Sequence, residues 1–133
     1  MNANELSKNY NIALLLLRLG VAAVFIYHGW GKITGIEGVQ QFFGNVGIPL
    51  PGIMAWVVGI TEFVGGIMVL TGFKIKIPSI LLAIIMVVAI LTVKMGQGFE
   101  AARVDILLLM MTSSLALMGS GSYSLDSMMG SKD

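Results

Sequence analysis

The sequence contains no cysteine and a single histidine, His28, among its 133 residues. The absence of cysteine excludes disulfide bonds, cysteine-ligated zinc, iron–sulfur clusters and a thiol redox cycle carried by the chain itself. One histidine is too few for a metal centre built from several histidine ligands, so we predict no metal site. Charge is also scarce, at 11% of residues with a formal net charge of +1. This excludes the basic surface that a nucleic-acid-binding protein needs.

Apolar residues are correspondingly abundant. They make up 56% of the chain, and the mean hydropathy is +0.90. A soluble domain of this length buries only part of its chain and cannot hide so much apolar surface. The composition therefore predicts an integral membrane protein that is embedded in the lipid bilayer.

Four segments are long and apolar enough to cross a membrane. A hydrocarbon core about 30 Å thick requires about 20 mostly apolar residues in a helix. Such segments cover approximately residues 11–30, 52–72, 78–94 and 104–119. We predict an all-α, integral membrane four-helix bundle, formed by one domain over residues 1–133.

The longest predicted connection, residues 31–51, has helical character of its own. Val39, Phe42, Phe43 and Val46 recur at helical spacing beside polar glutamine and asparagine residues. This pattern is typical of an amphipathic helix that lies in the membrane interface. We expect a short interfacial helix between the first and second spans.

Lysine and arginine in short loops indicate the orientation, because cytoplasmic loops are enriched in them. With a cytoplasmic amino terminus, the inner side holds four such residues and the outer side three, the pair Lys74 and Lys76 falling inside. We therefore expect a multi-pass protein of the plasma (inner) membrane with both termini in the cytoplasm. The inner residues are Lys8, Lys74, Lys76 and Lys132, and the outer ones are Lys32, Lys94 and Arg103.

Two charged residues fall within the predicted spans. Arg18 interrupts the first and Glu62 the second, and charges in hydrocarbon usually face the bundle interior or a cavity. From their depths in the spans we predict that Arg18 pairs with Glu62. The pair is either a structural ion pair that sets helix register or the polar floor of a cavity.

A second polar set lies near the outer ends of the spans. His28 and Lys32 are four residues apart and share a helical face, while Lys94 ends the third span and Asp105 begins the fourth. We predict that these four residues line one cavity inside the bundle and that Asp105 pairs with Lys94 or Lys32. The alternative is interface anchoring by side chains that reach out of the membrane.

Several short motifs carry a family resemblance. They are Arg18-Leu19-Gly20, Phe25 and His28-Gly29-Trp30-Gly31-Lys32 in the first span, Gly47-Ile48-Pro49-Leu50-Pro51 in the loop, Glu62-Phe63-Val64-Gly65-Gly66 with Leu70 and Gly72 in the second span, and Gly119-Ser120-Gly121-Ser122-Tyr123-Ser124-Leu125-Asp126 at the end. Over residues 12–126 this combination resembles the DoxX family of small four-helix inner-membrane proteins.

The resemblance implies a plasma-membrane protein with a redox-associated role, because the family takes its name from a subunit of an archaeal thiosulfate:quinone oxidoreductase. Most members of the family have no assigned activity, so the resemblance does not imply catalysis. Lys94 stands where relatives often have histidine, which disfavours a metal or haem site. Asp105 stands where many have glutamate, which keeps the carboxylate but shortens its reach.

The function favoured at this point is a membrane subunit or accessory of a redox system, either a quinone-linked oxidoreductase or an oxidative-stress complex. A quinone site needs an apolar slot and a few polar groups, which His28, Lys32, Glu62, Lys94 and Asp105 could supply. No flavin or nicotinamide motif is evident, so we expect no intrinsic cofactor. If the chain is catalytic, it acts as an oxidoreductase subunit whose electrons come from a soluble or membrane redox partner or from a bound cofactor.

Two other functions stay open. One is a non-enzymatic membrane scaffold for a soluble partner, and the other is a permease or binding protein for small molecules or lipids. A four-helix bundle of this size is also compatible with a homodimer, for which the sequence selects no face.

Overall fold

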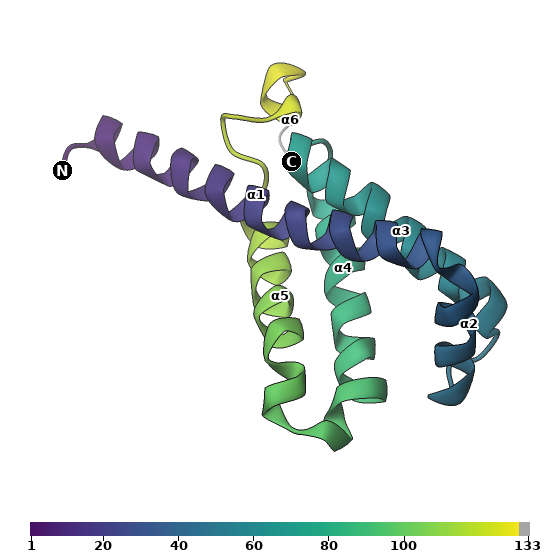
Figure 1. Ribbon diagram of the computed structural model, residues 1–133. Coiled ribbons are helices and arrows are strands. Elements are labelled where there is room, and N and C mark those ends of the chain that lie inside the picture. The colour runs from purple at the N-terminus through teal and green to yellow at the C-terminus, as the bar shows by residue number, and fades with distance from the viewer. Residues whose placement is uncertain (131–133) are drawn as a thin grey trace.

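The computed structural model describes residues 1–130, apart from the side chains of Lys94 and Met95. Lys132, one of the residues used to predict orientation, lies outside the described residues. Every regular element in the described part is helical (Figure 1). The elements are α1 (Ala3–Thr34), α2 (Ile36–Asn45), α3 (Pro51–Thr71), α4 (Lys76–Ala89), the π-helical turn η1 (Ile90–Lys94), the 3-10 turn η2 (Met95–Gln97), α5 (Phe99–Met118) and α6 (Leu125–Met128).

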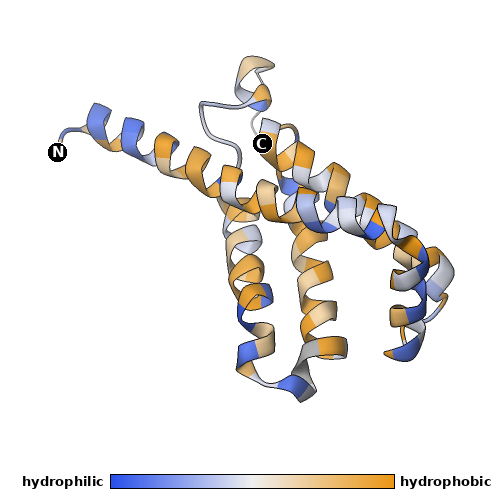
Figure 2. Ribbon diagram, in the orientation of Figure 1, coloured by the Kyte–Doolittle hydropathy of each residue, from blue (hydrophilic) through white to orange (hydrophobic). Residues whose placement is uncertain are grey.

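Four of these helical segments are long and apolar enough to span a membrane. They are α1, α3, α4 with its continuation to Val93, and α5. Apolar residues cover their central turns, and polar residues gather at the amino-terminal end of α1 and around the turn between α4 and α5 (Figure 2). The predicted all-α four-helix membrane fold is confirmed.

The first helix is longer than the predicted span of residues 11–30. It begins at Ala3 because Asn2 and Glu5 form a capping box, in which the Asn2 side chain accepts a hydrogen bond from the Glu5 backbone N–H and the Glu5 carboxylate accepts one from the Asn2 backbone N–H. Residues 1–10 are exposed, and this end of α1 projects beyond the other helices (Figure 1).

The short helix predicted in the longest loop is present as α2. Phe43 is its buried residue, and the Gln40 side-chain amide donates a hydrogen bond of 2.9 Å to the Gly52 carbonyl. Pro51 occupies the first turn of α3, a position where its missing N–H costs nothing. Together these contacts hold α2 against the start of α3.

Glycines set the register between α1 and α3, which pack closely as an antiparallel pair. A Cβ at Gly29 would collide with the backbone of Phe63, and a Cβ at Gly66 would come within 2.8 Å of the Ile26 side chain. Small residues allow membrane helices to approach to backbone contact. Gly29 is therefore held opposite the centre of α3, and Ile26 opposite Gly66.

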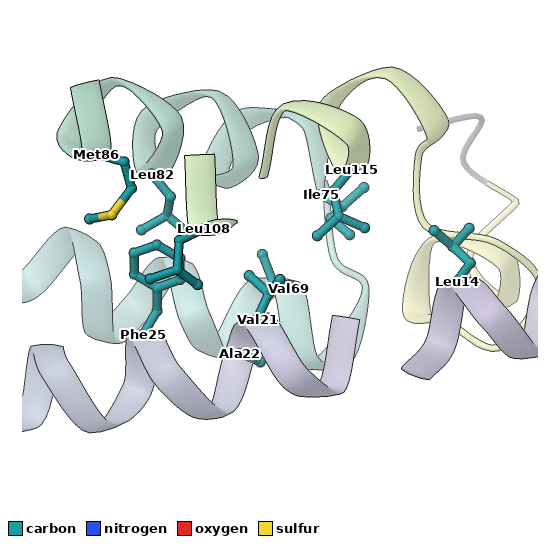
Figure 3. Packing of buried hydrophobic residues seen from close by; sticks show 10 residues of the cluster. All are labelled: Leu14, Val21, Ala22, Phe25, Val69, Ile75, Leu82, Met86, Leu108 and Leu115. Atoms are coloured by element: carbon teal, nitrogen blue, oxygen red, sulfur yellow. The ribbon is translucent and has the colours of Figure 1, made fainter. Parts of the chain in front are cut away.

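The second close pair is α4 with α5, and the apolar core lies between the two pairs. Figure 3 shows Phe25, Val21 and Val69 from the first pair pointing toward Leu82 and Leu108 from the second. Leu14 lies apart, beside the segment that follows α5. The core thus occupies the middle of the bundle and leaves its two ends for polar clusters.

Candidate functional site

Glu62 is a carboxylate buried within the bundle. Its side chain is 1% exposed, and its Oε1 lies 2.8 Å from the Nζ of Lys32, whose side chain is 27% exposed. Neither carboxylate oxygen has a partner in hydrogen-bond geometry among the described residues. Oε1 is therefore neutralised by the ammonium group, while Oε2 is a buried acceptor that has no donor within the described part of the structure.

The register of α1 and α3 explains why Lys32 is the partner. A Cβ built on Gly59 would lie 3.3 Å from the Cβ of Lys32, so the lysine begins beside α3 about one turn from Glu62. Its flexible stem then carries the ammonium group inward, as lysine stems commonly do along apolar surfaces.

A cavity of about 460 Å³ lies next to this pair. Residues from α1, α2, α3, α4, η1 and α5 line it, and most of the lining is aliphatic or aromatic. Small-molecule sites in proteins occupy about 300–1,000 Å³ and combine an apolar lining with a few polar groups. The polar lining residues are His28, Lys32, Thr61, Glu62, Thr92 and Asp105.

The exposed part of the lining is mostly apolar, and Thr92 is its exposed polar residue among those described. Five lining residues are between 43% and 54% exposed, namely Phe42, Val57, Leu81, Ile84 and Val88. On helices that span a membrane, such side chains face hydrocarbon. Four of the five lie on α3 and α4, so the exposed apolar lining of the cavity belongs mainly to two helices of spanning length.

The wall formed by α4 departs from α-helical geometry. Residues Ile90–Lys94 form the π-helical turn η1, and Thr92 and Val93 from this turn line the cavity. The Thr92 hydroxyl donates to the Val88 carbonyl at 2.7 Å. Single π-helical turns occur frequently at functional sites because they redirect side chains.

The structure brings together most of the predicted polar set. His28, Lys32 and Asp105 line the same cavity, and Glu62 joins them in its wall. Lys94 lies in η1, but its side chain is outside the described residues, so its predicted contact with Asp105 stays a prediction. The other predicted partner of Asp105, Lys32, pairs instead with Glu62.

A family model described as DoxX matches residues 13–95. The chain belongs to the DoxX family. It is 40% identical over 122 residues to a Bacillus subtilis protein named "Putative oxidoreductase CatD", covering 91% of this chain and 90% of the relative. It is 33% identical over 134 residues to the Escherichia coli "Inner membrane protein YqjF", covering 96% and 99%. No solved structure matches.

The predicted ion pair between Arg18 and Glu62 is wrong in this DoxX-family protein. Arg18 lies beside the carboxyl end of α3, whereas the position of α1 opposite Glu62 is near Gly29. These positions are about ten residues apart, which is roughly 15 Å along a helix. The prediction paired the two charges from their depth in the predicted spans. The glycine contacts set a register between α1 and α3 that differs from this pairing by about two helical turns.

Arg18 instead binds four backbone carbonyls, an arrangement called here the Arg18 clamp. Its side chain is buried, with the residue 1% exposed. The guanidinium donates to Val69 at 3.0 Å, Ser120 at 3.1 Å, Tyr123 at 2.7 Å and Leu70 at 2.7 Å. Two carbonyls end α3 and two belong to the segment after α5, so one side chain ties that segment to α3.

Asp126 completes the same end of the bundle and was not predicted as a structural residue. It is 1% exposed and accepts hydrogen bonds from the Lys74 N–H at 2.8 Å and the Ser120 hydroxyl at 2.6 Å. Its own N–H donates to the Gly72 carbonyl at 3.0 Å. The sequence feature that could have indicated this role is the family motif Gly119–Asp126. In the structure this segment folds back onto the turn between α3 and α4.

Proposed function

We propose that this DoxX-family membrane protein is the ligand-holding subunit or accessory of a redox system, and that it binds a quinone-type ring from the bilayer. The observation that carries the proposal is the cavity of about 460 Å³ that combines a mostly apolar lining with a buried carboxylate and its ammonium partner. A lipophilic ring with polar substituents matches both features of such a site.

The polar groups have distinct tasks in this proposal. Lys32 and His28 carry N–H groups that donate hydrogen bonds to a ring oxygen. The carboxylates of Glu62 and Asp105 accept hydrogen bonds from a ring hydroxyl. The two ring nitrogens of His28 can also donate and accept a proton, as quinone chemistry requires. The electrons come from a redox partner chain or a bound cofactor, since the sequence has no cysteine and no evident cofactor motif.

The relative named as an oxidoreductase supports a redox role, because the alignment with it covers nearly all of both chains. The relative named only as an inner membrane protein agrees with the location. We further propose the plasma membrane as that location, with both termini cytoplasmic. The Arg18 clamp then lies at the cytoplasmic end of the bundle and the polar lining of the cavity in the outer half.

Purification in native lipid nanodiscs followed by mass spectrometry tests the proposal. We expect a co-purified quinone in the wild-type protein and its loss in His28→Ala, with the bundle still folded by circular dichroism. Leu117→Ala is the control, because Leu117 is 84% exposed and lies outside this cavity.

Other outcomes separate the competing functions. A stoichiometric soluble protein without quinone would favour the scaffold, and enriched phospholipid without quinone would favour a lipid-binding protein. Full quinone occupancy in His28→Ala would contradict the role given to His28.

A further inference from the structure

One carboxylate oxygen of Glu62, Oε2, lacks a partner in the described part of the structure and can therefore distinguish ligands that carry a donor from ligands that do not. Among the described residues Oε2 has no hydrogen-bond donor, although Glu62 is almost completely buried. A buried acceptor without a donor is costly, and more so when it carries charge. A ligand that supplies a donor at this position removes that cost, whereas a ligand without one leaves it in place.

The two forms of a quinone differ in this respect. The oxidised ring presents carbonyl oxygens, which only accept hydrogen bonds, whereas the reduced ring presents hydroxyl groups, which also donate. A carbonyl placed against Glu62 Oε2 would set two acceptors against each other. A hydroxyl in the same place would form a charge-assisted O–H···O⁻ bond, which is short and strong.

The other charged groups of the cavity agree with this reading. Asp105 adds a second carboxylate to the lining, and the Lys32 ammonium already faces Glu62 Oε1. Glu62 Oε2 and the carboxylate of Asp105 are therefore acceptors that a donor on the ligand can satisfy.

We propose that the cavity selects the reduced, diphenol form of its ligand, with one ring hydroxyl donating to Glu62 Oε2. This inference rests on the proposed function, because it concerns the same cavity and ligand class. Preferential binding of the reduced form also makes the bound quinone easier to reduce. Its two-electron midpoint potential rises by about 30 mV for each tenfold preference.

The experiment compares three lipophilic probes on the purified protein in nanodiscs under anaerobic conditions. The probes are decylhydroquinone, the matching decylbenzoquinone, and the dimethyl ether of the hydroquinone, which has the same ring without donors. We expect the hydroquinone to bind at least about tenfold more tightly than either other probe, since both leave Oε2 unpaired. The ether comparison needs only the wild-type protein, so it holds even if a variant fails to fold.

Glu62→Gln tests the residue. Its amide offers a donor as well as an acceptor, so the preference should fall to within about threefold of equal binding. Glu100→Gln is the matched control, because it is the same substitution at a carboxylate that is 86% exposed and lies outside this cavity. This control should keep the wild-type preference.

The outcomes separate this inference from the proposed function. Binding of none of the three probes would overturn the proposed function, and this inference with it. Equal binding of all three probes, or tighter binding of the quinone, would overturn only the preference for the reduced form. A preference that survives Glu62→Gln would show that Glu62 does not provide it.

Discussion

Replacement of Arg18 by leucine tests the Arg18 clamp most directly. The change removes four hydrogen bonds to the carbonyls of Val69, Leu70, Ser120 and Tyr123. It also removes the positive charge that acts on buried Asp126. Leucine fills part of the space, so the loss is electrostatic and polar rather than a cavity effect.

The magnitude follows from how many of these bonds are buried. A hydrogen bond that involves a charged group contributes about 1.5–3 kcal/mol, but water can replace the part-buried bonds to Leu70 and Tyr123. The buried bonds to Val69 and Ser120 are lost without replacement by water. We expect Arg18→Leu to lower the free energy of unfolding by about 3–5 kcal/mol, comparable to the breaking of a buried ion pair. Arg18→Lys should recover less than half, because a lysine ammonium lacks the planar fork of arginine.

Two measurements report the effect. Denaturation in mixed micelles gives the unfolding free energy, and limited chymotrypsin digestion at Tyr123 reports whether the segment after α5 has come loose. Arg103→Leu is the control, since Arg103 makes an exposed pair with Glu100 and such pairs contribute about 0–1 kcal/mol. A loss below about 1 kcal/mol in Arg18→Leu, with unchanged resistance at Tyr123, would refute the clamp as a stabilising element.

Three further outcomes follow from the helix packing and the ion pair. Gly29→Ala should destabilise the bundle by about 1–3 kcal/mol through overpacking, whereas Gly20→Ala, with open space around it, should be neutral or stabilising; equal effects would contradict the close approach at Gly29. Lys32→Met should cost more than the double change Lys32→Met/Glu62→Met, because the single change strands a buried carboxylate; additive costs in the double-mutant cycle would show no coupling. A cysteine at Ser127 should react with an impermeant maleimide only from the cytoplasmic side and one at Gly98 only from the opposite side, and the reverse pattern would invert the proposed orientation.

The helices were predictable because their signals are local. Apolar runs of spanning length identify four membrane helices, and the spacing of Val39, Phe42 and Phe43 identifies α2. The early start of α1 was also readable, since Asn2 and Glu5 have the spacing of a capping box. Predictions that depended on composition and periodicity therefore agree with the structure.

The polar partners were less predictable because they depend on register between helices. Depth in a span does not determine which residues face each other, and the contacts at Gly29 and Gly66 move Glu62 toward Lys32 and away from Arg18. The partners of Arg18 are backbone carbonyls, which carry no signature in side-chain sequence. The shared cavity of His28, Lys32 and Asp105 was predictable because helical spacing and a short turn brought them to one depth.

The Arg18 clamp also has a consequence for biosynthesis. Arg18 emerges from the ribosome with the first span, but two of its acceptors, Ser120 and Tyr123, follow the last one. Half of its acceptors are therefore synthesised only after the fourth spanning helix. The carbonyls of Val69 and Leu70 become available with the second span. The first two long helices together therefore supply two of the four acceptors of Arg18. The clamp is complete only when the segment after α5 has folded back onto the end of α3, so it requires all of the chain through Tyr123.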